Sequence, residues 1–314
     1  MTSVLRQLRP GDELIVVDDG STDNTIHALE KFKDSIKYIH IQNSGAGAAR
    51  NEGLRHANGE LIAFLDSDDE WMDNKTELQR NLFERRPDIF YAFSNMSITR
   101  KSGEVVKSFL IHWHNDKRKW DEIIGRGQKY SSLYPLPQNC PDFMVYQGDL
   151  YKELASAPYI FTSSLMTRRA GAGEKWYFDE ELTIYEDWCC YGRIAGLGKG
   201  AYLDVDLAWQ HGHDGARLTN CAKSVEKFDS RLTALMKVWG EDEKFLEKHK
   251  NYFNKIVRNV QLMSVIETIK IGNEKEARAK IDKMIREGVI NIRALMFLPL
   301  QAVRLICSLM LKLT

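Results

Sequence analysis

Three groups of acidic residues could do chemistry, because two of them directly follow apolar runs and the third stands far downstream. These groups are Asp18-Asp19, Asp66-Ser67-Asp68-Asp69 and Glu186-Asp187. Carboxylates at the ends of apolar segments are costly to bury unless a positive group joins them. A divalent cation shared with a phosphate-bearing ligand meets that need. The pattern therefore predicts one site for a cation and a phosphorylated ligand.

The elements that must position these acids can be predicted from the apolar pattern. Nearly continuous apolar runs are typical of strands that are covered on both faces. The predicted strands are residues 14–17, 38–41, 61–65, 90–93 and 159–166, and the predicted helices between them are 25–32, 46–57 and 75–85. This alternation indicates an α/β fold with a doubly wound, mostly parallel sheet. Ligands of such sheets bind beyond the carboxyl ends of the strands, where both aspartate groups fall.

The C-terminal part of the chain has a different pattern. From residue 224 to about 287 the sequence is charged and helical in period, and residues 290–314 are rich in Leu, Met, Ile and Val. Pro299, Arg304 and Lys312 interrupt this last stretch, which makes it a poor membrane-spanning helix. Two alternatives stay open: an amphipathic segment on a membrane surface, or a helix packed on the protein's own core or on a partner subunit.

Composition narrows the class of protein. The chain has 314 residues and 43% hydrophobic residues, which suffices for one large α/β domain with an appendage. Lys plus Arg and Asp plus Glu each number 44, so bulk charge gives no reason to expect a nucleic-acid partner. Residues 1–10 lack the apolar core of a signal peptide, which predicts a cytoplasmic location.

Four segments, taken in order, resemble the family 2 glycosyltransferases. They are L-I-V-V-D-D-G-S-T-D at 14–23, N-S-G-A-G-A-A-R-N-E-G at 43–53, G-E-L-I-A-F-L-D-S-D-D-E-W at 59–71, and F-D-E at 178–180 with Y-E-D-W at 185–188. The resemblance covers roughly residues 12 to 220. It implies a GT-A fold, a nucleotide-sugar donor, a divalent metal (Mn or Mg) and inversion at the anomeric carbon. Residues 1–220 would form this catalytic domain, and residues 221–314 a helical extension.

The metal is expected at the Asp-Ser-Asp-Asp segment. Negative charge builds on the diphosphate when the sugar leaves, and a bound cation can neutralise it. By resemblance, Asp68 matches the last aspartate of the family's D-x-D motif and is the expected metal ligand, while Asp66 faces the ribose or shares the metal through water. His211 or His213 is expected on the metal or the diphosphate. The alternative is a carboxylate-rich turn that caps the next helix.

The resemblance also assigns donor-binding and catalytic residues. Asp18 and Asp19 match the family's nucleotide-binding pair, with Asp19 nearest the base and Asp18 alternatively a structural cap. Arg50 and Asn51 match the family's A-R-N segment, where an arginine pairs with a strand-end aspartate or a phosphate.

On the acceptor side, an inverting transfer needs a base that deprotonates the attacking hydroxyl. Asp187 matches the family's base, and Glu186 is the second candidate. The alternative is that both acids stabilise the start of a helix over residues 188–195.

One departure from the family pattern bears on function. The family opens with a buried strand of the type S-V-I-I-P-x-Y-N, whereas residues 3–7 look like the end of the helix that follows it. Without that strand an internal sheet edge would be open. The expected function is metal-dependent transfer of a sugar, UDP-linked, to a glycan or lipid-linked acceptor in cell-surface polysaccharide synthesis, at the inner face of the plasma membrane. The alternative is a non-catalytic nucleotide-sugar binder or a truncated member that acts as a partner subunit.

Overall fold

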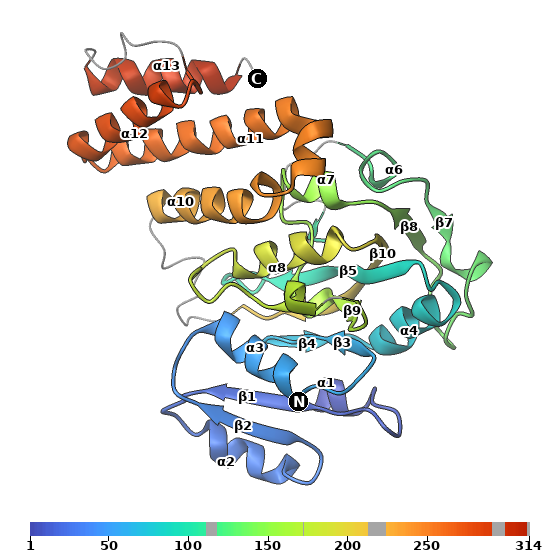
Figure 1. Cartoon of the computed structure of the whole chain (residues 1–314). Coiled ribbons are helices and arrows are strands. Elements are labelled where there is room, and N and C mark those ends of the chain that lie inside the picture. The colour runs from blue at the N-terminus through green and yellow to red at the C-terminus, as the bar shows by residue number, and fades with distance from the viewer. Residues whose placement is uncertain (111–117, 172, 213–223, 291–298, 313–314) are drawn as a thin grey trace. The chain divides into compact units, whose positions relative to one another are not determined.

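The chain folds into two compact units, each described by itself below. The computed structural model describes residues 1–110, 118–171, 173–212, 224–290 and 299–312 (Figure 1). Unit 1 holds Met1–Glu181 and Glu186–Gly215, and unit 2 holds Leu182–Tyr185 and Ala216–Thr314. The domain boundary predicted at residues 220 and 221 lies outside the described residues.

Unit 1 begins with a small parallel sheet of two strands. β1 (Ile15–Asp19) pairs with β2 (Lys37–Ile41), and α2 (Thr25–Leu29) with the 3-10 turn Glu30–Phe32 connects them. The chain returns through α3 (Ala46–His56), which packs on β1. Gly53 allows this packing, since a Cβ there would lie 3.6 Å from Val17 Cγ2. A short helix, α1 (Thr2–Leu5), precedes this sheet.

The larger sheet of unit 1 has eight strands and mixed pairing. Its order is β3-β9-β5-β10-β8-β7, with β4 on β10 and β6 on β5. β5 and β10 pair in parallel, and the other pairings are antiparallel. The strands are β3 (Leu61–Ala63), β4 (Asp69–Trp71), β5 (Ile89–Thr99), β6 (Val105–Val106), β7 (Gln128–Lys129), β8 (Met144–Gly148), β9 (Met166–Arg168) and β10 (Lys199–Gln210).

Helices of unit 1 cover this sheet. α8 (Glu186–Ala195) lies across β5 in Figure 1, and α4 (Lys75–Arg85) buries Leu78 and Leu82 against the sheet. Two short helices, α6 (Trp120–Ile123) and α7 (Tyr151–Leu154), complete the unit. The buried core that results holds β3, from whose end the acidic segment 66–69 emerges, and α8, which the pair Glu186-Asp187 opens.

The strand predicted over residues 159–166 is wrong. Residues Thr162–Ser164 form a 3-10 turn, η3, and the strand β9 begins only at Met166. Short hydroxyl side chains compete with strand pairing by bonding to nearby backbone groups. Ser164 Oγ does so, donating to the Phe161 carbonyl at 2.9 Å. The strand β10 has no counterpart among the predicted strands, although it lies between β5 and β8 in the sheet.

The two sheets of unit 1 meet at unpaired edges. β1 pairs with β2 alone, and β3 is the end strand of the larger sheet, so no strand within the described residues joins β1 to β3. Glu13 Oε1 accepts the Gly59 amide at 2.9 Å, which links the segments just before these two strands. That the first strand of the family pattern would close such an edge stays a prediction.

Unit 2 is a group of helices. They are α10 (Ser224–Leu235), the π-helical turn η5 (Met236–Gly240), α11 (Glu243–Lys270), α12 (Glu274–Arg286) and α13 (Leu300–Lys312). Asp242 and Asn273 cap α11 and α12, each accepting a backbone amide three residues further on. Figure 1 shows α11 between α10 on one side and α12 with α13 on the other.

The last helix buries its apolar side within unit 2. Val303 and Cys307 of α13 pack with Leu262 of α11 and Ile281 of α12. This packing favours the alternative in which the C-terminal segment covers the protein's own core. Among the described helices, none is both long enough and apolar enough to pass through a membrane.

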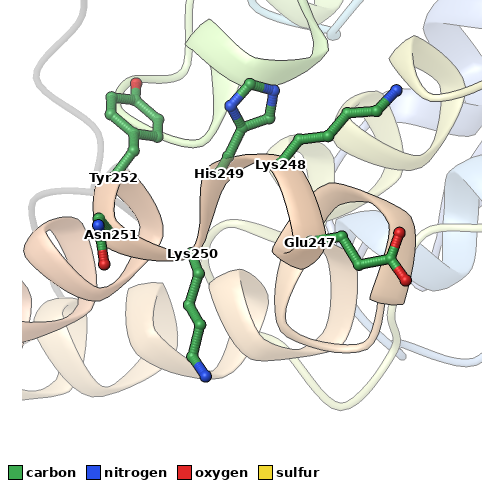
Figure 2. A pocket seen from close by; sticks show the side chains of 6 residues that line it. All are labelled: Glu247, Lys248, His249, Lys250, Asn251 and Tyr252. Carbon is green, nitrogen blue, oxygen red and sulfur yellow. The ribbon is translucent and has the colours of Figure 1, made fainter.

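A pocket in unit 2 has none of the predicted site residues in its lining. Figure 2 shows it along α11, lined by the consecutive residues 247–252. His249 departs from helical geometry, with φ −130° and ψ 18°, so the helix is kinked there. A kink in one helix opens such a hollow by itself, and we assign the pocket no chemistry.

Candidate functional site

Arg50 joins the acidic loop after β3 to the acidic pair at the start of α8. Its Nη2 donates to Asp66 Oδ1 at 2.8 Å, and its Nη1 donates to Glu186 Oε1 at 2.9 Å. The guanidinium also lies 5.2 Å from the centre of the Phe178 ring. The side chains of Arg50 and Glu186 are 15% and 10% exposed, so their ion pair is sheltered from water, whereas the Asp66 side chain is 37% exposed. Three segments that are far apart in sequence therefore meet at one side chain.

Gly47 lets Glu186 approach α3 closely. A Cβ at position 47 would lie 3.3 Å from Glu186 Cγ, which is tighter than most such contacts. Glu186 is buried, whereas Asp187 is partly exposed. Asp187 Oδ1 accepts the amide of the next residue, Trp188, at 2.6 Å. A capping side chain would accept an amide two or three residues further on, which this contact does not do. Both acids nevertheless lie in the first turn of α8, so the alternative that they stabilise the start of the helix stays open.

The two acids at the start of α8 hold protons more tightly than ordinary carboxyl groups. Burial raises the pKa of Glu186 to about 7, and the nearby charge of Asp187 adds to the effect. Burial likewise raises the pKa of Asp187, while the positive charge of Arg50 opposes the shift. Arg50, between its carboxylates, has its own pKa raised further above the ordinary value of arginine, even though burial opposes that shift. A carboxyl pair of this kind is poised to accept a proton near neutral pH.

The acidic loop is held by main-chain and side-chain hydrogen bonds. The Asp69 amide donates to the Asp66 carbonyl at 3.0 Å, closing a turn. Ser163 Oγ accepts the Asp66 amide at 3.2 Å and donates to Asp69 Oδ2 at 2.5 Å. Asp68, at the middle of the turn, is exposed. The loop therefore presents the Asp68 carboxylate outward while Asp66 and Asp69 turn toward the protein.

These residues fit a cation that is shared with a diphosphate better than a cation held by protein alone. Within the described part of the chain, His, Cys, Asp and Glu side chains form no group of three or more that could hold a metal ion. Magnesium in phosphate sites is commonly held by one or two carboxylates, with phosphate and water as the other ligands. Asp68, which is exposed, can meet that lower requirement.

The predicted nucleotide-binding pair is bonded to the protein itself. Asp18 is buried and accepts the Ser21 amide at 2.8 Å and the Tyr38 hydroxyl at 2.6 Å, with His40 Nδ1 at 3.4 Å. Burial alone would raise the pKa of Asp18, but these hydrogen bonds hold it well below the usual range. The structural alternative for Asp18 thus has direct support in the geometry.

Asp19 organises the loop before α3. Its two carboxylate oxygens accept the Ser44 amide at 2.7 Å and the Gly45 amide at 2.8 Å. Gly20, with φ 72°, makes the turn after β1 possible, because a Cβ there would lie 2.7 Å from the Asn43 amide nitrogen. Asp19 therefore sits at the start of the helix that carries Arg50.

Asn51 fastens the segment before α8 to α3. Its side-chain nitrogen donates to the Phe178 carbonyl at 2.9 Å and to Glu180 Oε1 at 2.7 Å, and its oxygen accepts the Phe178 amide at 2.8 Å. Its side chain is buried, so a ligand contact is less well supported than a role in placing residues 178–180.

The histidines predicted for the metal are only partly described. His211 Nε2 lies 3.1 Å from Glu70 Oε2, and its ring stacks on Trp209 at 5.1 Å. This contact holds the end of β10 against β4, which continues the acidic loop. His213 lies outside the described residues.

Sequence reasoning missed several residues around the site. Ser163 binds the acidic loop, Tyr38 binds Asp18, and the Tyr191 hydroxyl of α8 donates to Thr162 Oγ1 at 2.9 Å. A signal for the turn was available, since Thr162-Ser163-Ser164 places three hydroxyl residues in a row within an apolar run. Tyr38 and Tyr191 have no comparable signal, because single tyrosines occur throughout the chain.

Comparison with known proteins places this site in a family. A sequence model of glycosyl transferase family 2 matches residues 1–155. An uncharacterised glycosyltransferase of Nostoc is 41% identical over 239 residues, which cover 74% of this chain and 66% of that protein. The Escherichia coli protein WfgD, a UDP-Glc:α-D-GlcNAc-diphosphoundecaprenol β-1,3-glucosyltransferase, is 40% identical over 109 residues, which cover 34% of this chain and 43% of WfgD. The chain thus matches less than half the length of WfgD.

The fold is also that of a solved glycosyltransferase structure. The Staphylococcus aureus TarS structure, residues 1–349 with UDP-GlcNAc, superposes with a TM-score of 0.60 at 16% sequence identity, covering 98% of this chain and 83% of that chain. The predicted α/β class with a helical C-terminal part is confirmed by this likeness. The family match and the glycosyltransferase relatives show that the chain belongs to glycosyl transferase family 2.

Proposed function

We propose that this chain moves a sugar from a UDP-linked donor to a glycan or lipid-linked acceptor, with inversion at the anomeric carbon. The observation that carries the proposal is the double ion pair of Arg50 with Asp66 and Glu186. It places the loop expected to face the donor beside the acids expected to face the acceptor. A transfer reaction needs those two functions next to each other.

On the donor side, Asp68 would hold Mn or Mg together with the diphosphate. The cation, when bound, neutralises the charge that builds on the leaving diphosphate. Asp66 would then stay with Arg50 and orient the loop, and Asp19 would place the loop 44–45 near the nucleotide. The UDP-GlcNAc in the TarS structure and the UDP-Glc in the name of WfgD support a uridine nucleotide as the donor.

On the acceptor side, Asp187 would take the proton of the attacking hydroxyl. Burial raises its pKa, which suits a base that works near neutral pH. Glu186 stays with Arg50, and the charge of Asp187 helps to raise the pKa of Glu186. Attack from the side opposite the diphosphate would invert the anomeric carbon.

The acceptor class rests on the relatives. WfgD acts on a diphosphoundecaprenol-linked sugar by its name, which supports a lipid-linked or glycan acceptor and a role in cell-surface polysaccharide synthesis. Such an acceptor would bring the protein to the inner face of the membrane. Leu305 of α13 is 62% exposed and would be available for a peripheral contact there.

A donor assay with matched variants tests the proposal. UDP-Glc and UDP-GlcNAc are supplied with Mn, with Mg or with EDTA, and release of UDP is followed with and without a lipid-diphosphate sugar acceptor. We expect metal-dependent release that Asp68→Ala abolishes, and that Asp187→Asn reduces by several hundred-fold while donor binding persists. Calorimetry with UDP and Mn measures that binding.

The same assay separates the two functions considered. Binding of UDP by the wild type without any turnover would favour the non-catalytic binder, whose motivation is the open edge between β1 and β3. Transfer at the wild-type rate by Asp187→Asn would remove Asp187 from the role of base.

A further inference from the structure

The turn η3 (Thr162–Ser164) is buried and touches both halves of the site through two hydroxyl groups. Thr162, Ser163 and Ser164 are 5%, 1% and 0% exposed. A buried hydroxyl must find a hydrogen-bond partner, or its desolvation is uncompensated. The partners of these three side chains therefore indicate what each of them is placed to hold.

Ser163 binds the acidic loop at three points. Its Oγ accepts the Asp66 amide at 3.2 Å and donates to Asp69 Oδ2 at 2.5 Å. Its carbonyl accepts Trp71 Nε1 at 3.1 Å, and the same indole nitrogen lies 3.3 Å from the Phe64 carbonyl. The residues on either side of the exposed Asp68 are thus bonded to one serine. A hydrogen bond to a carboxylate is stronger than one between neutral groups.

Thr162 binds the helix that carries the acid pair. Its Oγ1 accepts the Tyr191 hydroxyl at 2.9 Å, and Tyr191 is buried, one helical turn beyond Asp187 on α8. The Tyr191 ring also packs edge-on against Phe178 at 6.0 Å, next to the Arg50 guanidinium. Adjacent residues of one turn therefore contact the acidic loop on one side and α8 on the other.

We propose that the hydroxyl groups of Thr162 and Ser163 are positioning groups that fix the acidic loop, residues 66–71, relative to α8. Ser163 sets the direction in which Asp68 faces the donor, and Thr162 sets the position of α8 and its acid pair. Both side chains act through other residues and touch no substrate. The consequence for transfer rests on the proposed function, whereas the physical hold on the loop does not.

Ser164 provides a matched control in the same turn. It is as buried as Ser163, but its hydroxyl donates to the Phe161 carbonyl at 2.9 Å, within the same segment. Its link to α4 runs through its carbonyl, which accepts Gln79 Nε2 at 2.8 Å and is unaffected by a change of side chain. Ser163→Ala and Ser164→Ala each remove one buried hydroxyl, and only the first removes contacts with the acidic loop.

The first experiment measures the hold on the loop without any substrate. Hydrogen–deuterium exchange is followed in the peptide that covers residues 64–72 in the wild type, Ser163→Ala and Ser164→Ala. We expect this peptide to exchange on the order of tenfold faster in Ser163→Ala and at the wild-type rate in Ser164→Ala. Ser163→Cys, which keeps the side-chain size and donates weakly, gives the same comparison if the alanine variant does not fold. Equal exchange in both serine variants would overturn the inference.

The second experiment uses kinetics to distinguish the role of Ser163 from that of Thr162. We expect Ser163→Ala to raise the donor KM on the order of tenfold, the effect of one lost charge-assisted hydrogen bond. Tyr191→Phe removes the bond to Thr162 and should lower kcat while leaving the donor KM in place. An equal loss of turnover in Ser163→Ala, Tyr191→Phe and the control Ser164→Ala would indicate general destabilisation and contradict the positioning role.

The two proposals fail in different ways. A wild-type protein that binds no UDP and releases none from its donors refutes the proposed function, while the exchange comparison still decides whether Ser163 holds the loop. Normal donor turnover by Ser163→Ala, with a wild-type KM, refutes the positioning role and leaves the proposed function standing.

Discussion

At the scale of single residues, Arg50 is the side chain on which the site depends most. The sequence motif around Arg50 predicts a pair with a strand-end aspartate. In the structure Arg50 forms this ion pair with Asp66. The second pair, with Glu186, joins positions 136 residues apart in sequence, and no local pattern predicts such a distance. The hydroxyl groups of Ser163 and Tyr191 were missed for the same reason, because their partners are distant in the chain.

Removing Arg50 should cost both stability and donor turnover. Arg50→Ala leaves the sheltered Glu186 without its cation, which typically costs about 3–5 kcal/mol, and the more exposed Asp66 adds little. Arg55→Ala, on the same helix, removes only a surface pair with Glu52 and should cost less than about 1 kcal/mol. Urea denaturation of the two variants measures the difference. Equal losses of the free energy of unfolding would mean that Arg50 contributes no more than a surface residue.

The raised pKa of Glu186 predicts how stability changes with pH. Its pKa is about 7 in the folded state, against an ordinary value of 4.5, so the folded state binds more protons between these values. The free energy of unfolding should therefore fall as pH rises from about 4.5 to about 7, by at most about 1.4 kcal/mol per pH unit. Glu186→Gln should make this fall smaller, and the raised pKa of Asp187 should leave a remainder. Denaturation at pH 5 and pH 7.5 measures it, and an unchanged difference in the variant would contradict the assignment.

At the scale of elements, the sequence predicts well those segments whose secondary structure is determined by their own residues. The helix over residues 75–85 and the strands near 14–17 and 38–41 agree with α4, β1 and β2. The failures are the 159–166 strand and the long strand β10, where distant partners decide the conformation. β10 pairs with β5, β8 and β4, and none of these pairings is visible in the local period.

Two glycines on α3 offer a test of how that helix positions the acid pair. A Cβ at Gly53 meets Val17 at an ordinary 3.6 Å, so Gly53→Ala should stabilise the protein by about 0.5–1 kcal/mol through helix propensity. A Cβ at Gly47 meets Glu186 Cγ at 3.3 Å, so Gly47→Ala should displace Glu186 and lower turnover. Thermal melts and donor assays of both variants measure this. Full activity in Gly47→Ala would show that Glu186 tolerates displacement.

At the scale of the whole molecule, the two units are interleaved in sequence. Leu182–Tyr185 belongs to unit 2, although the next residue, Glu186, opens α8 of unit 1. The extent of the family resemblance places a domain boundary near residue 220, and a linear run of motifs cannot reveal that a four-residue segment belongs with distant helices. The acid pair thus directly follows, in the chain, a segment of the other unit.

Because the two units are interleaved, we predict that a chain without the helices after residue 215 is less stable than the full chain. Leu182 and Ile184 are 8% and 7% exposed, and a chain ending at residue 215 would uncover them at a cost of about 1.5–3 kcal/mol each. We expect the shortened chain to melt at a lower temperature and to lose transfer more than donor binding. Circular dichroism and calorimetry with UDP measure both. A shortened chain with the melting temperature and turnover of the full chain would contradict this.

The division of unit 1 into two sheets also has a mechanical consequence. Asp18 and Asp19 stand on the two-stranded sheet, Asp66 and Asp68 follow the end strand of the other, and within the described residues no ladder of backbone hydrogen bonds crosses between these sheets. A nucleotide-sugar that contacts the aspartates of both sheets would link the two sheets to each other. Binding of the donor would then make the arrangement of the two sheets more rigid, and the same two sheets position the donor.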